Sequence, residues 1–137
     1  SIVCTDDFIF VGDDFQISQH YARHLSGGYV TRWVGRGESP VLALTAGAVA
    51  VVDDGGEPLG STRLLLASGH ARGNLELRRA YCSAEEEACE DDDDEAVISL
   101  GASVRALSLA GNGVLAAGCE SGLVILLGVA FEQTSPT

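Results

Sequence analysis

The chain has 137 residues, 46% of them hydrophobic, which is enough for one domain with a hydrophobic core. Its net charge of −12 is local, because nine of the 20 acidic residues fall within residues 85–95 and the other 11 nearly balance the 8 bases. Such a chain repels phosphates, which argues against nucleic acid or an anionic membrane as a partner, and no apolar run is long enough to span a membrane. With no signal peptide visible, we expect an intracellular, cytoplasmic protein.

Short apolar runs bounded by Gly, Asp, Ser or Pro predict β-strands along the whole chain, and no segment predicts an amphipathic helix. The strands fall into three units of four. We expect them at residues 2–5, 8–12, 16–22 and 29–34; at 41–45, 63–68, 74–81 and 96–100; and at 104–109, 114–118, 123–127 and 129–133. The run 48–53 is left over, and we expect it to form an extra hairpin with what precedes it. An alternative makes this run the second strand of its unit and shifts the later strands by one.

The second and third strands of each unit form a hairpin with the same layout. An apolar strand leads to a glycine, a short polar turn follows, and a second apolar strand returns. The glycines are Gly12, Gly69 and Gly118. Recurrent hairpins of this kind predict a repeat architecture built from small sheets, and they favour a binding scaffold over an enzyme.

The segment Val104–Leu127 resembles one blade of the WD40 repeat family. Gly111-Asn112-Gly113 stands at its first turn, where Asn-Gly is favoured, and Gly118 and Gly122 bracket the next turn. The family's Trp-Asp after the third strand is replaced by Leu127-Gly128, and the usual Gly-His before the first strand is missing. The family's hydrogen-bond network therefore cannot be carried over to residues of this chain.

The resemblance implies an all-β fold, a WD40-like β-propeller segment of about three four-stranded antiparallel blades within a single domain, residues 1–137. The blades would cover about 1–36, 40–100 and 103–137, the second carrying insertions at 47–62 and 82–95. Closed propellers have about four to eight blades, so further blades would come from a longer chain or from other chains. A small β-sandwich is the alternative fold.

The resemblance implies a non-catalytic protein-interaction scaffold or structural subunit of a multiprotein assembly. One alternative is a hydrolase or other enzyme on a partial propeller, for which the turns after the second strands offer His70 and a few carboxylates. These are Asp13, Asp14 and Glu120. The other is a weak RNA-binding module on the arginines of the second unit, Arg63, Arg72, Arg78 and Arg79.

The two insertions join strands at the same end of the second unit, and loops on a rigid scaffold commonly carry function. We expect their acidic residues to bind a basic protein surface, the alternative being a solvated spacer. The predicted partner-binding residues are Asp53, Asp54, Glu57, Glu85, Glu86, Glu87, Glu90, Asp91, Asp92, Asp93, Asp94 and Glu95.

The sequence predicts no cofactor and no metal site. The acidic run lacks the spaced ligands and central glycine of a calcium loop. His20 and His24 are four residues apart, but they fall on a predicted strand and its turn, where they would not share a face. Cys82 and Cys89 have the option of pairing, whereas we expect buried free thiols at the other two cysteines, Cys4 and Cys119.

Overall fold

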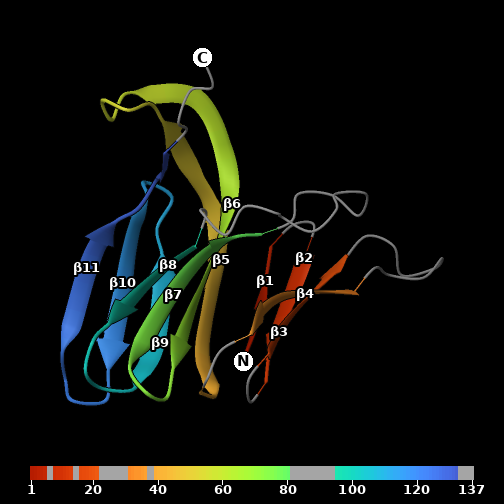
Figure 1. Ribbon diagram of the computed structural model, residues 1–137, viewed down its shortest axis with the longest axis vertical. Coiled ribbons are helices and arrows are strands. Elements are labelled where there is room, and N and C mark those ends of the chain that lie inside the picture. The colour runs from red at the N-terminus through yellow and green to blue at the C-terminus, as the bar shows by residue number, and fades with distance from the viewer. Residues whose placement is uncertain (6–7, 14–15, 22–30, 37–38, 81–94, 133–137) are drawn as a thin grey trace.

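The computed structural model describes residues 1–5, 8–13, 16–21, 31–36, 39–80 and 95–132, and all regular structure in these ranges is β-strand. The predicted all-β class is therefore confirmed. Apart from one parallel pair, neighbouring strands are antiparallel, and they form three sheets (Figure 1).

The first sheet contains four strands in sequence order. They are β1 (Ile2–Cys4), β2 (Phe8–Gly12), β3 (Gln16–Tyr21) and β4 (Thr31–Arg36). The second sheet contains β5 (Val41–Val52), β6 (Pro58–His70), β7 (Asn74–Arg79) and β8 (Glu95–Ser99) in order, with β12 (Phe131–Glu132) on the outer edge of β5. The third sheet contains β9 (Val104–Leu109), β10 (Val114–Cys119) and β11 (Val124–Gly128).

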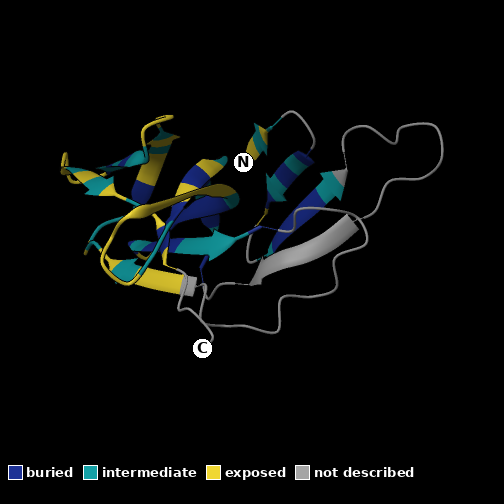
Figure 2. Ribbon diagram, turned by 90° about the horizontal axis from the view of Figure 1, so that it is seen from above, coloured by how far each residue is buried: buried dark blue, intermediate teal, exposed yellow. Residues whose placement is uncertain are grey.

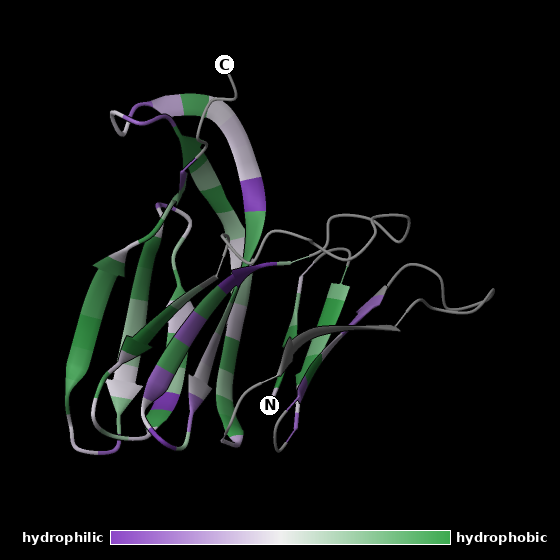
Figure 3. Cartoon of the chain, viewed as in Figure 1, coloured by the Kyte–Doolittle hydropathy of each residue, from purple (hydrophilic) through white to green (hydrophobic). Residues whose placement is uncertain are grey.

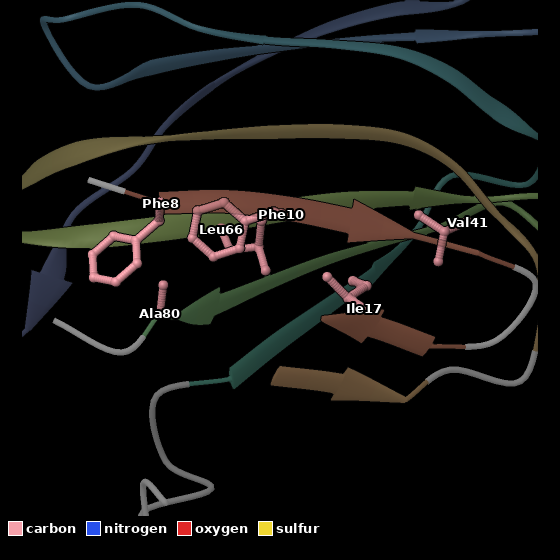
Figure 4. Close-up of a cluster of buried hydrophobic side chains, with 6 residues drawn as sticks. All are labelled: Phe8, Phe10, Ile17, Val41, Leu66 and Ala80. Carbon is pink, nitrogen blue, oxygen red and sulfur yellow. The ribbon is translucent and has the colours of Figure 1, made fainter. Parts of the chain in front are cut away.

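The second sheet lies between the other two, and its two faces bury different cores (Figure 2). Successive side chains of a strand point to opposite faces. Leu66 therefore packs against the first sheet and Ala67 against the third. The first core consists of Phe8, Phe10, Ile17, Val41, Leu66 and Ala80 (Figure 4). The second consists of Ala67, Leu75, Val104, Leu115, Ala117 and Cys119.

Most predicted strands are present, two of them with the predicted limits, 8–12 and 104–109. The insertion 47–62 was expected as a loop, and this expectation is wrong. Its two halves continue β5 and β6, which pair from Val41–His70 as far as Val52–Pro58. Residues 48–52 of the leftover run are accordingly part of β5, and the run forms no separate hairpin. The result is a long β5–β6 hairpin that extends beyond the other strands (Figure 1).

The predicted last strand, 129–133, also differs. Only Phe131 and Glu132 are strand, and they pair in parallel with Val51 and Val52 of the second sheet instead of extending the third. The physical reason is burial, because Phe131 packs against Val49, Val51 and Leu65 on the long hairpin. The third sheet consequently has three strands.

Candidate functional site

The two junctions between sheets are built around the same contact. A Cβ atom placed on Gly12 would lie 2.7 Å from Val41 Cγ1, and one placed on Gly69 would lie 2.5 Å from Val104 Cγ1. Gly12 is the last residue of the second strand of its sheet and Gly69 the last but one, and in both cases the valine opens the first strand of the next sheet. The absence of a side chain lets the valine sit directly against the glycine backbone, so each glycine acts as a hole for the following sheet.

Strand pairing gives these glycines a common register. Gly12 pairs with Ile17, Gly69 pairs with Leu75, and Gly118 pairs with Val124. On the other side, Gly69 pairs with Ala43 and Gly118 with Ala106. Gly118 is therefore the third member of the series.

Gly118 lies on a face that no described residue covers. Its nearest neighbour for a Cβ atom is Ala106 Cβ at 3.7 Å, and no valine approaches it. Ile17 and Leu75 are 1% and 0% exposed, whereas their counterpart Val124 is 68% exposed and the next outward residue of β11, Leu126, is 69% exposed. The residue paired with the glycine is thus buried in the first and second sheets and exposed in the third.

This outer face of the third sheet is uncharged. Its outward residues in register are Ala106, Ser108, Ala116, Gly118, Val124 and Leu126. Figure 3 shows β11 as hydrophobic along nearly its whole length. Arg105 and Glu120 form an exposed ion pair at one end of the strands, with Arg105 Nη2 3.3 Å from Glu120 Oε1. A contiguous apolar sheet face of this kind is typical of a protein-binding surface. We call it the outer face of the third sheet below.

Sequence inspection pointed to the three glycines but not to this surface. The signal was present in the alternation of β11, where Val124 and Leu126 sit on the side opposite Ile125 and Leu127. It was hidden because an apolar residue on both sides of a strand is equally typical of a strand covered on both faces.

A second group of interest is polar and buried, on the face of the second sheet that packs against the first. His70 Nε2 lies 2.7 Å from Glu76 Oε2 and 2.9 Å from Ser68 Oγ, and His70 Nδ1 lies 3.1 Å from the Ser39 carbonyl oxygen. A carbonyl and a carboxylate accept hydrogen bonds, so an imidazolium, which donates from both ring nitrogens, satisfies both contacts. Arg78 adds a second cation, 2.7 Å from Glu76.

The environment accounts for the charge states. Burial by itself would lower the pKa of His70, but the hydrogen bonds to Glu76 and the Ser39 carbonyl and the charge of Glu76 outweigh it, so the pKa is raised. The hydrogen bond with His70 lowers the pKa of Glu76 by more than burial raises it, and the charges of His70 and Arg78 lower it further. The group ties β6 and β7 to Ser39, in the connection between the first two sheets.

Ser68, His70 and Glu76 are the residue types of a hydrolytic triad, but they do not have its geometry. In a triad the nucleophile and the acid bind different nitrogens of the histidine. Here Ser68 and Glu76 share Nε2, and Nδ1 is occupied by the Ser39 carbonyl. Ser68 is also fully buried, so its hydroxyl does not meet a substrate. The arrangement is that of a structural hydrogen-bond group.

The predicted acidic partner-binding residues are placed only in part. Asp53 forms the turn of the long hairpin, its Oδ1 accepting the backbone N–H groups of Gly55 and Glu57 at 2.9 Å each. Asp54 and Glu57 are exposed at the same tip. Glu95 opens β8, and its backbone is paired with Arg78. The remaining residues, Glu85, Glu86, Glu87, Glu90, Asp91, Asp92, Asp93 and Asp94, lie outside the described residues, so their role stays a prediction.

The other candidates are separated. His70 binds Glu76, Glu120 pairs with Arg105, and His20 Nε2 lies 2.9 Å from Ser18 Oγ. His24, Cys82, Cys89 and Asp14 fall in ranges that are not described. Cys119 is a buried free thiol as expected, but Cys4 is exposed, because it lies on the outer side of β1.

Within the described ranges, no three His, Cys, Asp or Glu side chains come together as metal ligands. The same ranges contain no helix long and apolar enough to cross a membrane.

No family model matches the chain, and no curated protein matches it. Among solved structures, the chain is similar to one described as the crystal structure of the computationally designed Ika4 protein, with a TM-score of 0.60 and 16% sequence identity. The match covers 94% of this chain and 64% of that chain, so this chain spans less than two thirds of its length. At this level of identity the similarity shows the fold alone.

Proposed function

We propose that the chain is a non-catalytic protein-interaction scaffold, a WD40-like propeller segment of three blades within an intracellular, cytoplasmic multiprotein assembly. The three sheets are the proposed blades, and sheets of another protein chain would continue the stack. The observation that carries this proposal is the outer face of the third sheet. It shares the strand register of the faces that are buried at the two internal junctions, with an aliphatic residue at the Val124 position in all three sheets.

The energetic argument concerns Val124 and Leu126. Burying a valine or leucine side chain that is now in water contributes about 1.5–3 kcal/mol each. A partner that covers both, together with the smaller residues around Gly118, gains this energy without leaving a charge unpaired. A partner sheet that opens with a β-branched residue would also fill the hole at Gly118, as Val41 and Val104 fill the other two.

The acidic residues supply a second part of the proposal. Asp54 and Glu57 are exposed at the tip of the long hairpin, and we propose that they and the acidic run 85–95 bind a basic surface of a partner protein. Charge of one sign gathered in this way steers an oppositely charged partner and adds specificity.

The test compares two variants of the tagged chain in the cells that produce it. Leu126→Asp places a charge on the outer face, and Ser121→Asp places one in the exposed turn beside it. Native mass determination should find the unaltered chain and Ser121→Asp in the same larger assembly, and Leu126→Asp as the free chain. The proposal is wrong if Leu126→Asp remains in the assembly, or if the unaltered chain is itself isolated free.

A further inference from the structure

We propose that the outer face of the third sheet binds a second copy of this chain, against the outer side of that copy's first sheet. This inference rests on the proposed function and names the partner. It is drawn from the repetition of the sheet junctions, which gives the same chain both halves of one interface.

The outer side of the first sheet, which would receive the second copy, is identified from its strand register. The residue three positions before each glycine points toward the preceding sheet. These residues are Leu66 before Gly69 and Leu115 before Gly118, and both are 0% exposed because a sheet covers them. The corresponding residue of the first sheet is Ile9, which is only partly buried, since no described residues form a sheet on that side.

The residues around Ile9 extend this surface. Ile2 pairs with Val11 and Cys4 pairs with Ile9, so the four side chains share one face. None of them is charged, and Ile2 is 69% exposed. The outer side of β1 and β2 is thus aliphatic, like the outer face of the third sheet that it would meet.

The polar part of this surface, along β3, resembles the polar part of the second sheet where it faces the first sheet. Val11 pairs with Ser18, just as Ser68 pairs with Glu76 in the second sheet. The outer side of β3 therefore carries Ser18, which is only 7% exposed, and His20 at the positions that Glu76 and Arg78 occupy beside the first sheet. An apolar half along the first two strands and a polar half along the third are common to both surfaces.

The pairing of Ser1 with Gly12 fixes the register of β1 relative to the first strands of the other two sheets. Ser1 is hydrogen-bonded to Gly12, with its amino group 3.0 Å from the Gly12 carbonyl oxygen. Ser1 therefore corresponds to Ala43 and Ala106, and Val41 and Val104 lie two positions earlier.

The two halves differ, so the contact is head to tail, and such contacts form a closed ring or an open filament. Two copies would contribute six sheets, which is within the range of about four to eight for closed rings of stacked sheets. We therefore infer a closed pair of chains with two identical contacts.

The test uses the purified full chain of 14.2 kDa and its mass in solution by light scattering over a range of concentrations. Two variants each remove one half of the contact, Leu126→Asp on the third sheet and Ile2→Asp on the first. Ser121→Asp is the control, and circular dichroism checks that all variants remain folded. We expect a two-copy mass for the unaltered chain and the control, and association weakened about 30-fold or more in each single variant, as for central interface residues.

Mixing the two single variants distinguishes a head-to-tail contact from a contact between two third sheets. Each still has one intact half, so the mixture should regain a two-copy species that the double variant does not form. If Leu126→Asp breaks the pair and Ile2→Asp does not, the copies meet through two third sheets and the head-to-tail inference is wrong. If the purified unaltered chain is a monomer at every concentration, the inference is overturned, whereas the experiment on the cellular assembly decides the proposed function separately.

Discussion

Alanine substitutions at two glycines in the same register test the stacking of the sheets. Gly69 lies at the junction of the second and third sheets, and Gly118 holds the same position on the outer face. A Cβ atom at Gly69 would lie 2.5 Å from Val104 Cγ1, 2.8 Å from Val104 Cβ and 3.0 Å from the Val104 carbonyl oxygen. Carbon atoms settle at about 3.5–4.0 Å, so β9 would have to move by about 1 Å.

The magnitude follows from the kind of strain. Forcing a methyl group into a packed junction costs about 1–3 kcal/mol. At Gly118 the nearest atom is 3.7 Å away, an ordinary contact, and replacing glycine lowers the entropy of the unfolded chain, which stabilises by about 0.4–1 kcal/mol. Neither glycine has a positive φ, so backbone strain does not contribute.

Urea unfolding in dilute solution, where association does not contribute, measures the difference in free energy of unfolding. Both variants share the entropy gain of replacing glycine, so Gly69→Ala should be less stable than Gly118→Ala by the strain alone, about 1–3 kcal/mol. Trimming the neighbour should relieve part of the strain, so Gly69→Ala combined with Val104→Ala should cost less than the sum of the two single variants. Equal stability of the two alanine variants, or strict additivity with Val104→Ala, would refute the junction described here.

Three further outcomes are expected. Leu66→Ala, at a fully buried site between the first two sheets, should lower the free energy of unfolding by about 2–5 kcal/mol in the same urea assay. The contribution of His70 to the free energy of unfolding is complete below its ordinary pKa of 6.5 and is lost as the pH rises through its raised folded-state pKa. The contribution of Glu76 is complete above its ordinary pKa of 4.5 and is lost as the pH falls through its lowered folded-state pKa. Stability should therefore peak between these limits, and His70→Gln should flatten the alkaline side; an unchanged pH profile would count against the imidazolium. Asp53→Ala should cost about 1 kcal/mol and speed hydrogen exchange at the hairpin tip, whereas Asp54→Ala should leave both unchanged.

Strand positions were largely predictable from the sequence, because turn residues mark most strand ends. Gly12-Asp13 and Gly118-Cys119 end their strands close to the predicted positions. The long hairpin was missed because Gly47 interrupts the apolar run from Val41, and an isolated glycine in a strand pattern suggests a break. In the structure Gly47 instead makes room for Leu109, whose Cδ2 would lie 3.0 Å from an added Cβ atom.

The last strand was misplaced for a different reason. The register of 129–133 depends on what Phe131 packs against, and that partner, Val51, is 80 positions away in the sequence. The buried ionic group at His70 was likewise beyond local pattern, since it joins residues from β6, β7 and the connection at Ser39. Tertiary contacts of this kind leave no periodic signal.

The candidate binding surface illustrates the same limit. The equivalence of Gly12, Gly69 and Gly118 could be seen in the sequence, but only the structure shows that two of these holes are filled and one is open. The acidic residues were the obvious sequence feature, yet the side chain of Asp53 accepts hydrogen bonds from the backbone of its own hairpin turn.

The most direct test of the binding role is the reactivity of a thiol placed on the outer face. Leu126→Cys can be labelled with a maleimide and read by site-resolved mass spectrometry, with Ser121→Cys in the exposed turn as the matched reference. We predict rapid labelling of Cys at this site in the dilute purified chain and labelling slowed by at least about tenfold in the native assembly, corresponding to about 1.4 kcal/mol of protection. Equal labelling in both states would show that the face stays open to water and would contradict the account.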